Sequence, residues 1–263
     1  MSRALYSARL DHKTCISEPS QCYHLRFTLS DENGELPGFP FSAGQFVSVV
    51  ATDPGGKQQT RAYSIASAPD GNRLDLCVNR VEDGFFSNYL TGLAQDASVT
   101  LHGPYGYFVL QQPVTDSIFV AAGTGIAPIR GFTQWLFPKD GPDRSESKDI
   151  WLIYATGQEG TGHESDLYYH EEFEALAARK TNFHYLPIRG NIQQHVAKIV
   201  EERAARLGIS LPAAPVDPSI PRAELRFDIY AYICGLNEMV AGVREKLAGY
   251  GWHRKQIIFE RYD

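Results

Sequence analysis

The pattern of apolar residues changes near residue 112, and this change limits what the chain can fold into more than any other feature. Before that point, short runs rich in Val, Phe, Tyr and Leu alternate with turn signals such as Asn33-Gly34 and Asp70-Gly71. The runs cover residues 5–10, 23–30, 45–51, 61–67, 73–81 and 98–103. Such an alternation of short strands and turns is typical of an antiparallel barrel or sandwich. One short helix, over residues 85–93, is expected to interrupt it.

Beyond residue 112, apolar strand patterns alternate with helical patterns. The expected strands are residues 116–122, 149–155, 183–188 and 228–235, each followed by a helix over 126–137, 167–180, 191–208 or 237–251. Residues 256–260 are expected to form a last strand. Strand-helix units of this kind predict a parallel sheet flanked by helices. We therefore predict two domains, an antiparallel β-barrel over residues 1–112 and a Rossmann-like α/β domain over residues 113–263.

Charge and apolar content exclude several classes of protein. The net charge is −6, from 25 basic and 31 acidic groups, which gives no support to a broad nucleic-acid or anionic-membrane surface. No segment approaches the roughly 20 apolar residues of a membrane helix, so membrane insertion is not expected. The first residues lack the apolar core of a secretion signal. We expect a cytoplasmic protein.

The cysteines point to reduced thiols rather than to a cross-linked or metal-binding chain. The four of them, Cys15, Cys22, Cys77 and Cys234, are too few and too scattered for a disulfide framework. Their spacing does not match the C-x4-C-x2-C of a plant-type iron-sulfur cluster. No C-x2-C or closely spaced Cys/His pair is present, so we predict no zinc site and no other metal site.

The segment Gly123-Thr124-Gly125 places glycines between a predicted strand and a predicted helix. Glycine allows the backbone to approach a ligand, and the start of a helix offers unpaired N–H groups that suit a pyrophosphate. Pro128 fits the first helical turn. A simple tight turn between strand and helix is the alternative interpretation, since the segment is not a G-x-G-x-x-G fingerprint.

A second candidate is Arg61-Ala62-Tyr63-Ser64, at a turn-flanked strand. Alternate residues of a strand share a face, so Arg61 and Tyr63 are expected to point together and Ser64 the other way. A cation and a flat aromatic ring on one face can hold a phosphate and cover an aromatic cofactor. A solvated cross-strand ladder has the same pattern and is the alternative.

Taken together, these motifs resemble those of the ferredoxin-NADP reductase superfamily over nearly the whole chain. The flavin-domain motif R-x-Y-S is present at residues 61–64, and the nucleotide-domain motifs G-T-G-I-A-P and C-G are present at 123–128 and 234–235. Residues 83–87 and 106–110 resemble the bacterial-type ferredoxin/flavodoxin-NADP reductases in particular. The resemblance implies that the barrel binds FAD and that the Rossmann-like domain binds NAD(P).

The resemblance also implies roles for single residues on the flavin side. The candidates are Arg61, Tyr63, Ser64, Cys77, Val78, Asn79, Arg80, Gly84, Phe85 and Ser87. Arg61 would bind the pyrophosphate, Tyr63 would pack on the isoalloxazine, and Ser64 would lie near N5. Gly84 and Ser87 would hold the pyrophosphate at a helix N-terminus, where unpaired N–H groups favour an anion.

Two aromatic residues of this motif have a second interpretation. Phe85 and Phe86 follow Gly84 directly and can equally be core residues of the barrel. The segment from Cys77 to Arg80 is expected to run beside the cofactor because relatives place it there.

On the nucleotide side, the resemblance assigns Gly123, Thr124 and Gly125 to the pyrophosphate of NAD(P). Cys234 and Gly235 would lie close to the nicotinamide, although a buried cysteine at a strand end is usually inert packing.

The end of the chain has two further candidates. Glu260 stands where relatives have a carboxylate near the flavin. Tyr262 would stack on part of the FAD or shield an edge of it. The catalytic candidates are therefore Ser64, Cys234 and Glu260.

The choice between NADPH and NADH depends on Arg189. Bacterial relatives often have an arginine where Thr156-Gly157 stands here, and Ser-Arg where Ile188-Arg189 stands. Arg189 can bind a 2'-phosphate bidentately or lie along an exposed loop. We favour NADPH on the first alternative.

The function implied is transfer of electrons between NAD(P)H and a separate one-electron carrier, a ferredoxin or a flavodoxin, by hydride transfer to flavin N5. One alternative is an NAD(P)H-dependent reductase of free flavin, quinone or ferric chelates, or the reductase component of an oxygenase. The other is a non-catalytic subunit that holds flavin and never meets the pyridine nucleotide. The G-T-G-I-A-P motif argues against this last alternative.

Overall fold

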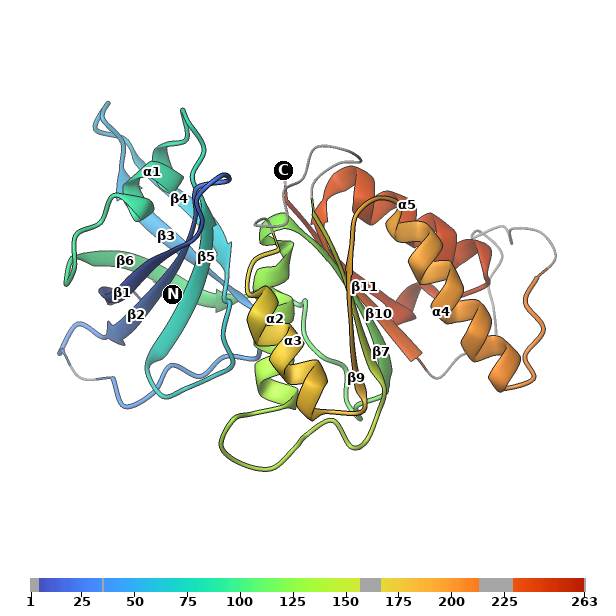
Figure 1. Ribbon diagram of the computed structural model, residues 1–263. Helices are drawn as coiled ribbons and strands as arrows, with labels where there is room; N and C mark the ends of the chain where they lie inside the picture. The colour runs from blue at the N-terminus through green and yellow to red at the C-terminus, as the bar shows by residue number, and fades with distance from the viewer. Residues whose placement is uncertain (1–4, 35, 157–166, 213–228, 263) are drawn as a thin grey trace. The chain divides into compact units, whose positions relative to one another are not determined.

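The structure is a computed structural model that describes residues 5–34, 36–156, 167–212 and 229–262. The described chain divides into two compact units, whose elements are labelled in Figure 1. The first unit runs to Leu110 and takes in Ala127–Arg144, and the second comprises Gln111–Ile126 and the chain from Ser145 onward. The boundary between residues 112 and 113 remains a prediction.

The first unit is built on a six-stranded antiparallel sheet. Its strands are β1 (Leu5–Ser17), β2 (Cys22–Ser30), β3 (Phe46–Thr52), β4 (Gln58–Ser64), β5 (Arg73–Asn79) and β6 (Ser98–Tyr105). They are hydrogen-bonded in the order β4-β3-β6-β1-β2-β5, and a bridge between Ile65 and Leu76 joins the two ends of this order. The sheet therefore closes on itself, which confirms the predicted antiparallel barrel.

Alternation along the strands decides which side chains fill the barrel. Leu25, Phe27 and Leu29 of β2 are fully buried in its core, whereas Arg26 between them is exposed. The strand β4 begins at Gln58, before the predicted segment, because its polar first residues are hydrogen-bonded to β3 but give no hydrophobic signal.

Two helices belong to this unit. The helix α1 (Phe85–Thr91) lies between β5 and β6 in the chain, as predicted, and buries Leu90 in the barrel core. The helix α2 (Ile126–Leu136) packs closely on the same unit from Ala127 onward. The ring centres of Phe132 and Phe108 are 5.3 Å apart, and a Cβ on Gly131 would lie 3.0 Å from the Ser67 carbonyl oxygen.

The second unit contains a parallel sheet, as the strand-helix alternation predicts. Its five strands are β7 (Asp116–Ala122), β8 (Ile150–Ala155), β9 (Phe183–Ile188), β10 (Ile229–Leu236) and β11 (Ile257–Tyr262), in the order β11-β10-β7-β8-β9. All six residues of β8 are buried. An uninterrupted apolar strand of this kind is expected where both faces of a sheet are covered.

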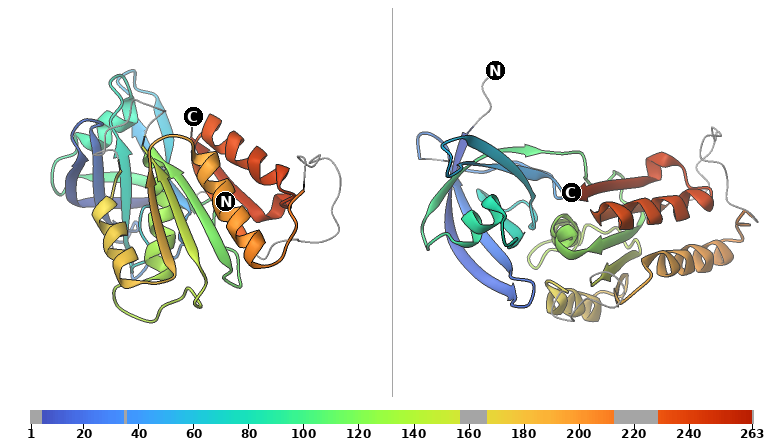
Figure 2. Two further views of the ribbon diagram at one scale, coloured as in Figure 1. Left: turned by 45° about the vertical axis from the view of Figure 1, so that its right-hand side comes forward. Right: turned by 90° about the horizontal axis from the view of Figure 1, so that it is seen from above.

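Three helices cover this sheet. They are α3 (His170–Arg179), α4 (Ile192–Arg206) and α5 (Asn237–Gly249). Figure 2 shows α4 and α5 side by side, and both contribute to one core cluster with the strands. The helix α3 packs against β9. Within the described ranges, none of the helices is long and apolar enough to cross a membrane.

Candidate functional site

The strand β4 presents Arg61, Tyr63 and Ser64 in a regular ladder with β3. Val49 pairs with Arg61 and Val47 with Tyr63, so these two side chains share a face and Ser64 has the opposite one, as alternation predicts. Arg61 is exposed, and Tyr63 is half-buried against the barrel core. Burial raises the pKa of Tyr63 to about 12, although the charge of Arg61 acts in the other direction. The phenol therefore stays protonated near neutral pH.

The end of β5 changes from buried to exposed over four residues. Cys77 and Val78 are buried, and Asn79 and Arg80 are exposed. The Nε of Arg80 donates a hydrogen bond of 2.7 Å to Oδ1 of Asn88 on α1. This contact holds the guanidinium beside the start of the helix, where a cation can meet an anionic ligand.

The turn that leads into α1 requires Gly84. A Cβ at this position would lie 2.6 Å from the Ser87 Oγ and 3.0 Å from the Cβ of Val81. The Ser87 Oγ accepts a hydrogen bond of 3.0 Å from the Val81 N–H, and the Asn88 amide donates to the carbonyl oxygens of Val81 (2.7 Å) and Gly84 (2.8 Å). Gly84 has no side chain with which to cap the helix, so an anion can meet bare backbone N–H groups here.

Sequence reasoning missed Asn88 and left the role of two neighbouring aromatic residues open. The amide of Asn88 organises the turn before α1, and the only signal was an Asn soon after the glycine, a type that often bonds local backbone. Phe86 is buried in the barrel core, and the Phe85 ring lies 5.0 Å from it. Phe86 is thus a core residue, and a cofactor role for Phe85 remains a prediction.

A buried ion cluster on the outer face of β5 was also missed. The Asp75 carboxylate is 3% exposed and accepts hydrogen bonds from Arg26 Nε (2.9 Å) and Arg130 Nη1 (3.1 Å), with His24 Nε2 at 3.5 Å. Burial acts to raise the pKa of Asp75, but the Arg26 hydrogen bond and the charges of His24, Arg130 and Arg26 outweigh it and lower the pKa. Arg130 also donates to the Ala66 carbonyl at 2.7 Å. The cluster therefore fixes α2 to β5, the strand of the barrel that also contains Cys77.

The glycine segment of the second unit forms one turn of 3-10 helix, Gly123–Gly125, between β7 and α2. A Cβ on Gly125 would lie 2.2 Å from the carbonyl oxygen of Cys234 and 2.9 Å from the amide nitrogen of Gly235. The Tyr154 hydroxyl donates a hydrogen bond of 3.1 Å to the Gly123 carbonyl. The backbone of Gly125 thus packs directly on the backbone of Cys234 and Gly235, so a residue with a side chain does not fit at position 125.

This contact lies where the order of the parallel strands reverses. From β7 the chain continues to β8 on one side of it, whereas β10 lies on the other. Ala121 pairs with both Tyr154 and Cys234. Crevices at such switch points, beyond the carboxyl ends of the strands, are the usual ligand sites of open α/β sheets. The structure thus brings the predicted Gly123, Thr124 and Gly125 together with Cys234 and Gly235.

The residues near the end of the chain lie beside the same strand. Cys234 pairs with Glu260 and Leu236 with Tyr262. Cys234 is fully buried, and burial and the Glu260 charge raise the pKa of its thiol, while a hydrogen bond with Tyr262 acts in the other direction. Cys234 is therefore a neutral thiol near neutral pH and not a nucleophile.

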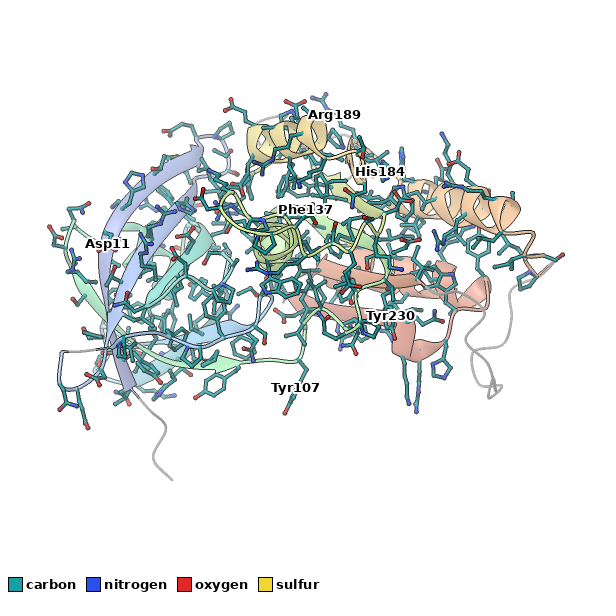
Figure 3. All side chains as sticks on the ribbon, turned by 90° about the horizontal axis from the view of Figure 1, so that it is seen from below. Asp11, Tyr107, Phe137, His184, Arg189 and Tyr230 are labelled. Carbon is teal, nitrogen blue, oxygen red and sulfur yellow. The ribbon has the colours of Figure 1, made fainter. Side chains whose placement is uncertain are left out.

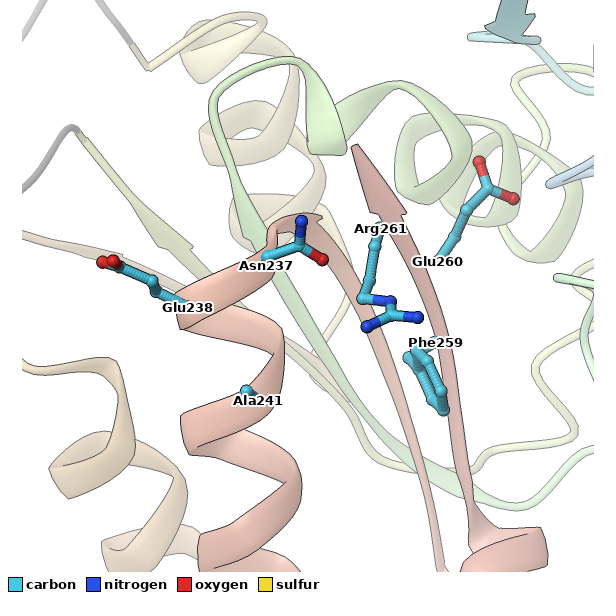
Figure 4. Close-up of a pocket in the computed structure, with 6 residues that line it drawn as sticks. All are labelled: Asn237, Glu238, Ala241, Phe259, Glu260 and Arg261. Carbon is cyan, nitrogen blue, oxygen red and sulfur yellow. The ribbon is translucent and has the colours of Figure 1, made fainter. Parts of the chain in front are cut away.

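An open hollow of about 700 Å³ lies between the start of α5 and β11. Figure 4 shows its lining residues, which are Asn237, Glu238, Ala241, Phe259, Glu260 and Arg261. The Arg244 guanidinium lies 3.8 Å from the centre of the Phe259 ring. The hollow thus combines an aromatic surface with both signs of charge, next to Glu260.

Arg189 directly follows β9 and is exposed on the surface (Figure 3). Ala155 pairs with Ile188, and Thr156 is 4% exposed and donates its N–H to the Ile188 carbonyl at 3.3 Å. Arg189 is therefore at the edge of the sheet that contains the glycine turn. Gly157 lies outside the described residues. In the described ranges, no group of three or more His, Cys, Asp or Glu side chains could hold a metal ion.

Comparison with known proteins identifies the two halves of the chain. Residues 7–110 match the family described as the oxidoreductase FAD-binding domain, and residues 119–245 match the oxidoreductase NAD-binding domain. The chain is 35% identical to ferredoxin–NADP reductase B of Sorangium cellulosum, over 89% of this chain and 91% of that protein. It is 25% identical to the electron transfer component of toluate 1,2-dioxygenase from Pseudomonas putida, over 95% of this chain and 67% of that protein.

A solved structure has the same fold. The ferredoxin NADP+ reductase of Neisseria gonorrhoeae, determined with bound FAD and NADP, superposes with a TM-score of 0.72 at 19% sequence identity. The match covers 99% of both chains.

Proposed function

Because the chain belongs to the ferredoxin–NADP reductase family of FAD-dependent oxidoreductases, we propose that it passes electrons between a nicotinamide dinucleotide and a separate one-electron carrier protein. A ferredoxin or a flavodoxin is the carrier proposed. The contact of the Gly123–Gly125 turn with Cys234 and Gly235, at the switch point of the sheet, is the observation on which the proposal depends. We assign FAD to residues 1–112 and the dinucleotide to residues 113–263.

The barrel has the groups that FAD needs. Arg61 and Arg80 offer cations for the pyrophosphate, and the glycine cradle at Gly84 leaves backbone N–H groups of α1 for its oxygens. Tyr63 provides a protonated, half-buried ring that suits packing on the isoalloxazine. When bound, FAD supplies hydride acceptance at N5 and release of electrons one at a time.

The other residues would act by position and not by acid-base chemistry. Ser64 can donate a hydrogen bond from a buried strand end, and Cys234 can do so as a neutral thiol. Glu260 would place a carboxylate beside Cys234, and Tyr262 would cover the same strand end. Gly123, Thr124, Gly125 and Gly235 would form the dinucleotide site, in which Gly125 packs on the backbone of Cys234 and Gly235.

The decisive experiment mixes the purified yellow protein with NADPH or NADH and then with candidate acceptors. Bleaching of the flavin, followed by rapid reduction of ferredoxin or flavodoxin, is the expected result. Fast reduction of free flavin, quinone or ferric chelate without carrier reduction would instead favour a reductase of diffusible acceptors. The similarity to an electron transfer component of a dioxygenase makes the reductase component of an oxygenase the second candidate function, with the oxygenase as the acceptor. No bleaching with either dinucleotide would leave only a flavin-holding subunit.

We propose NADPH as the dinucleotide, because Arg189 is an exposed cation at the carboxyl end of β9. Arg189→Ala is expected to raise the KM for NADPH about tenfold or more and to leave the KM for NADH nearly unchanged, since only NADPH has a 2'-phosphate. Equal changes in both KM values would remove Arg189 from this role. Arg179→Ala, on the last turn of α3, is the matched surface control.

A further inference from the structure

Cys22 and Cys77 lie side by side on neighbouring strands of the barrel. Their Sγ atoms are 3.5 Å apart although 55 positions separate the residues in the sequence. The β2–β5 register pairs Cys22 with Asn79 and His24 with Cys77, so the two cysteines are diagonal neighbours on one face of the ladder. The sequence alone predicts scattered, reduced thiols, because only the strand register brings these two together.

The face that contains them is not the barrel interior. Leu25 follows His24 in the sequence and Val78 follows Cys77, so their side chains point to the opposite face, and both belong to the apolar core. Cys22 and Cys77 share their face with His24 and Asp75 instead. The thiols therefore lie on the same face as two polar groups, His24 and Asp75.

The two thiols differ in access. Cys22 is fully buried, and Cys77 is 6% exposed. A small oxidant therefore reaches Cys77 first, and Cys22 is then positioned to resolve the product.

We propose that Cys22 and Cys77 are a redox-modification site that forms a reversible intramolecular disulfide when the protein meets a peroxide. The Cys77 thiolate attacks the O–O bond of hydrogen peroxide, which gives a sulfenic acid and hydroxide, and protonation of the hydroxide gives water. The Cys22 sulfur then attacks the Cys77 sulfur, the S–O bond breaks, and a second water leaves. Two thiols lose two electrons and two protons in total, and one peroxide is reduced to two waters.

Closing this bond requires the sulfur atoms to approach from 3.5 Å to about 2.05 Å. Cys22 is the first residue of β2 and follows a turn in which Gln21 has a positive φ of 49°. A strand end next to such a turn can shift more easily than the middle of a ladder. This is where the required movement is expected.

The test uses the full-length holoprotein at low concentration, treated with hydrogen peroxide and then alkylated with N-ethylmaleimide under denaturing conditions. We expect intact mass to show two labels in place of four, and peptide mapping to show Cys22 joined to Cys77. Dithiothreitol should restore four labels. Cys22→Ser should stop formation of the disulfide and leave Cys77 oxidised beyond the sulfenic acid, whereas Cys15→Ser should form the disulfide as the natural protein does.

Three results would overturn the proposal. They are labelling of both Cys22 and Cys77 after a peroxide dose that already oxidises Cys15, a cross-link between any other cysteines or between two chains, and irreversible oxidation of Cys77 with no disulfide. None of these depends on flavin reduction or on any acceptor. The outcome is therefore independent of whether the proposed electron transfer is correct.

Discussion

Replacing Asp75 with Asn should cost about 3 kcal/mol of unfolding free energy. The carboxylate is 3% exposed and interacts with Arg26, Arg130 and His24. Removing one partner of a buried charge pair typically costs about 3–5 kcal/mol, because the other charge stays buried without compensation. Arg130 is 7% exposed and bears this penalty, whereas the Arg26 side chain is 44% exposed and can rehydrate. The lower end of the range is therefore expected.

The pH dependence of this stabilisation follows from the lowered pKa of Asp75. An ordinary Asp in the unfolded chain titrates near about 3.9. The folded pKa lies below its ordinary value, so the contribution is fully present above about pH 4 and is lost as the pH falls through the folded pKa. The difference between the natural protein and Asp75→Asn should accordingly shrink in acid, as the pH falls through the folded pKa of Asp75.

Urea unfolding followed by far-ultraviolet circular dichroism measures both effects. Asp70→Asn is the matched control, because Asp70 pairs with Arg73 at 2.7 Å but both side chains are more than half exposed. Such an exposed pair contributes about 0–1 kcal/mol. If the urea midpoint of Asp75→Asn lies within experimental error of that of Asp70→Asn, the carboxylate does not contribute the predicted stabilisation. A difference that persists undiminished in acid would show that the charge of Asp75 is not its cause.

Three further substitutions test two proposed site residues and one hydrogen bond of the second unit. Arg61→Ala removes a charge-assisted contact worth about 1.5–3 kcal/mol, so the Kd for FAD should rise roughly tenfold to a hundredfold; unchanged flavin content after gel filtration would contradict its role. Gly125→Ala puts a Cβ 2.2 Å from the Cys234 carbonyl oxygen, at a cost of about 1–3 kcal/mol, and should raise the KM for the dinucleotide more than it affects flavin content. Gly38→Ala, whose Cβ meets nothing closer than 3.8 Å, should change neither value. Tyr232→Phe removes the hydroxyl that accepts the Gln111 N–H at 2.9 Å and should lower the unfolding free energy by about 0.5–1.5 kcal/mol, whereas an unchanged denaturation midpoint would show that water replaces the bond.

Local patterns predicted most of the fold, because apolar residues recur at the spacing with which a strand or helix buries one face. The alternation around Arg26 in β2 identified a strand with one buried face, and the apolar run of β8 identified a strand covered on both faces. The least accurate boundaries were those of β1, which continues to Ser17 beyond the predicted residues 5–10, and of β4, which begins at Gln58 before the predicted residues 61–67. Backbone hydrogen bonding does not require apolar residues, so composition gives no sign of it.

The candidate sites were partly predictable for a similar reason. Glycine turns such as Gly123–Gly125 are visible in the sequence because few other residues allow the close approach that Cys234 requires. Asn88 left only a weak signal, because its amide donates hydrogen bonds to carbonyl groups of a neighbouring turn. The roles of the individual residues toward FAD and the dinucleotide remain predictions.

Patterns within the sequence specify the order of strands and helices, the two kinds of sheet and the positions of the glycine and R-x-Y-S motifs, because these features depend on neighbours within a few residues. The contacts of Asp75 with Arg130 and of Cys22 with Cys77 are visible only in the folded chain. These pairs depend on the register between strands and on the packing of a helix over 50 residues away. Contacts of that range are set by the sum of many weak interactions, and no single stretch of sequence records them.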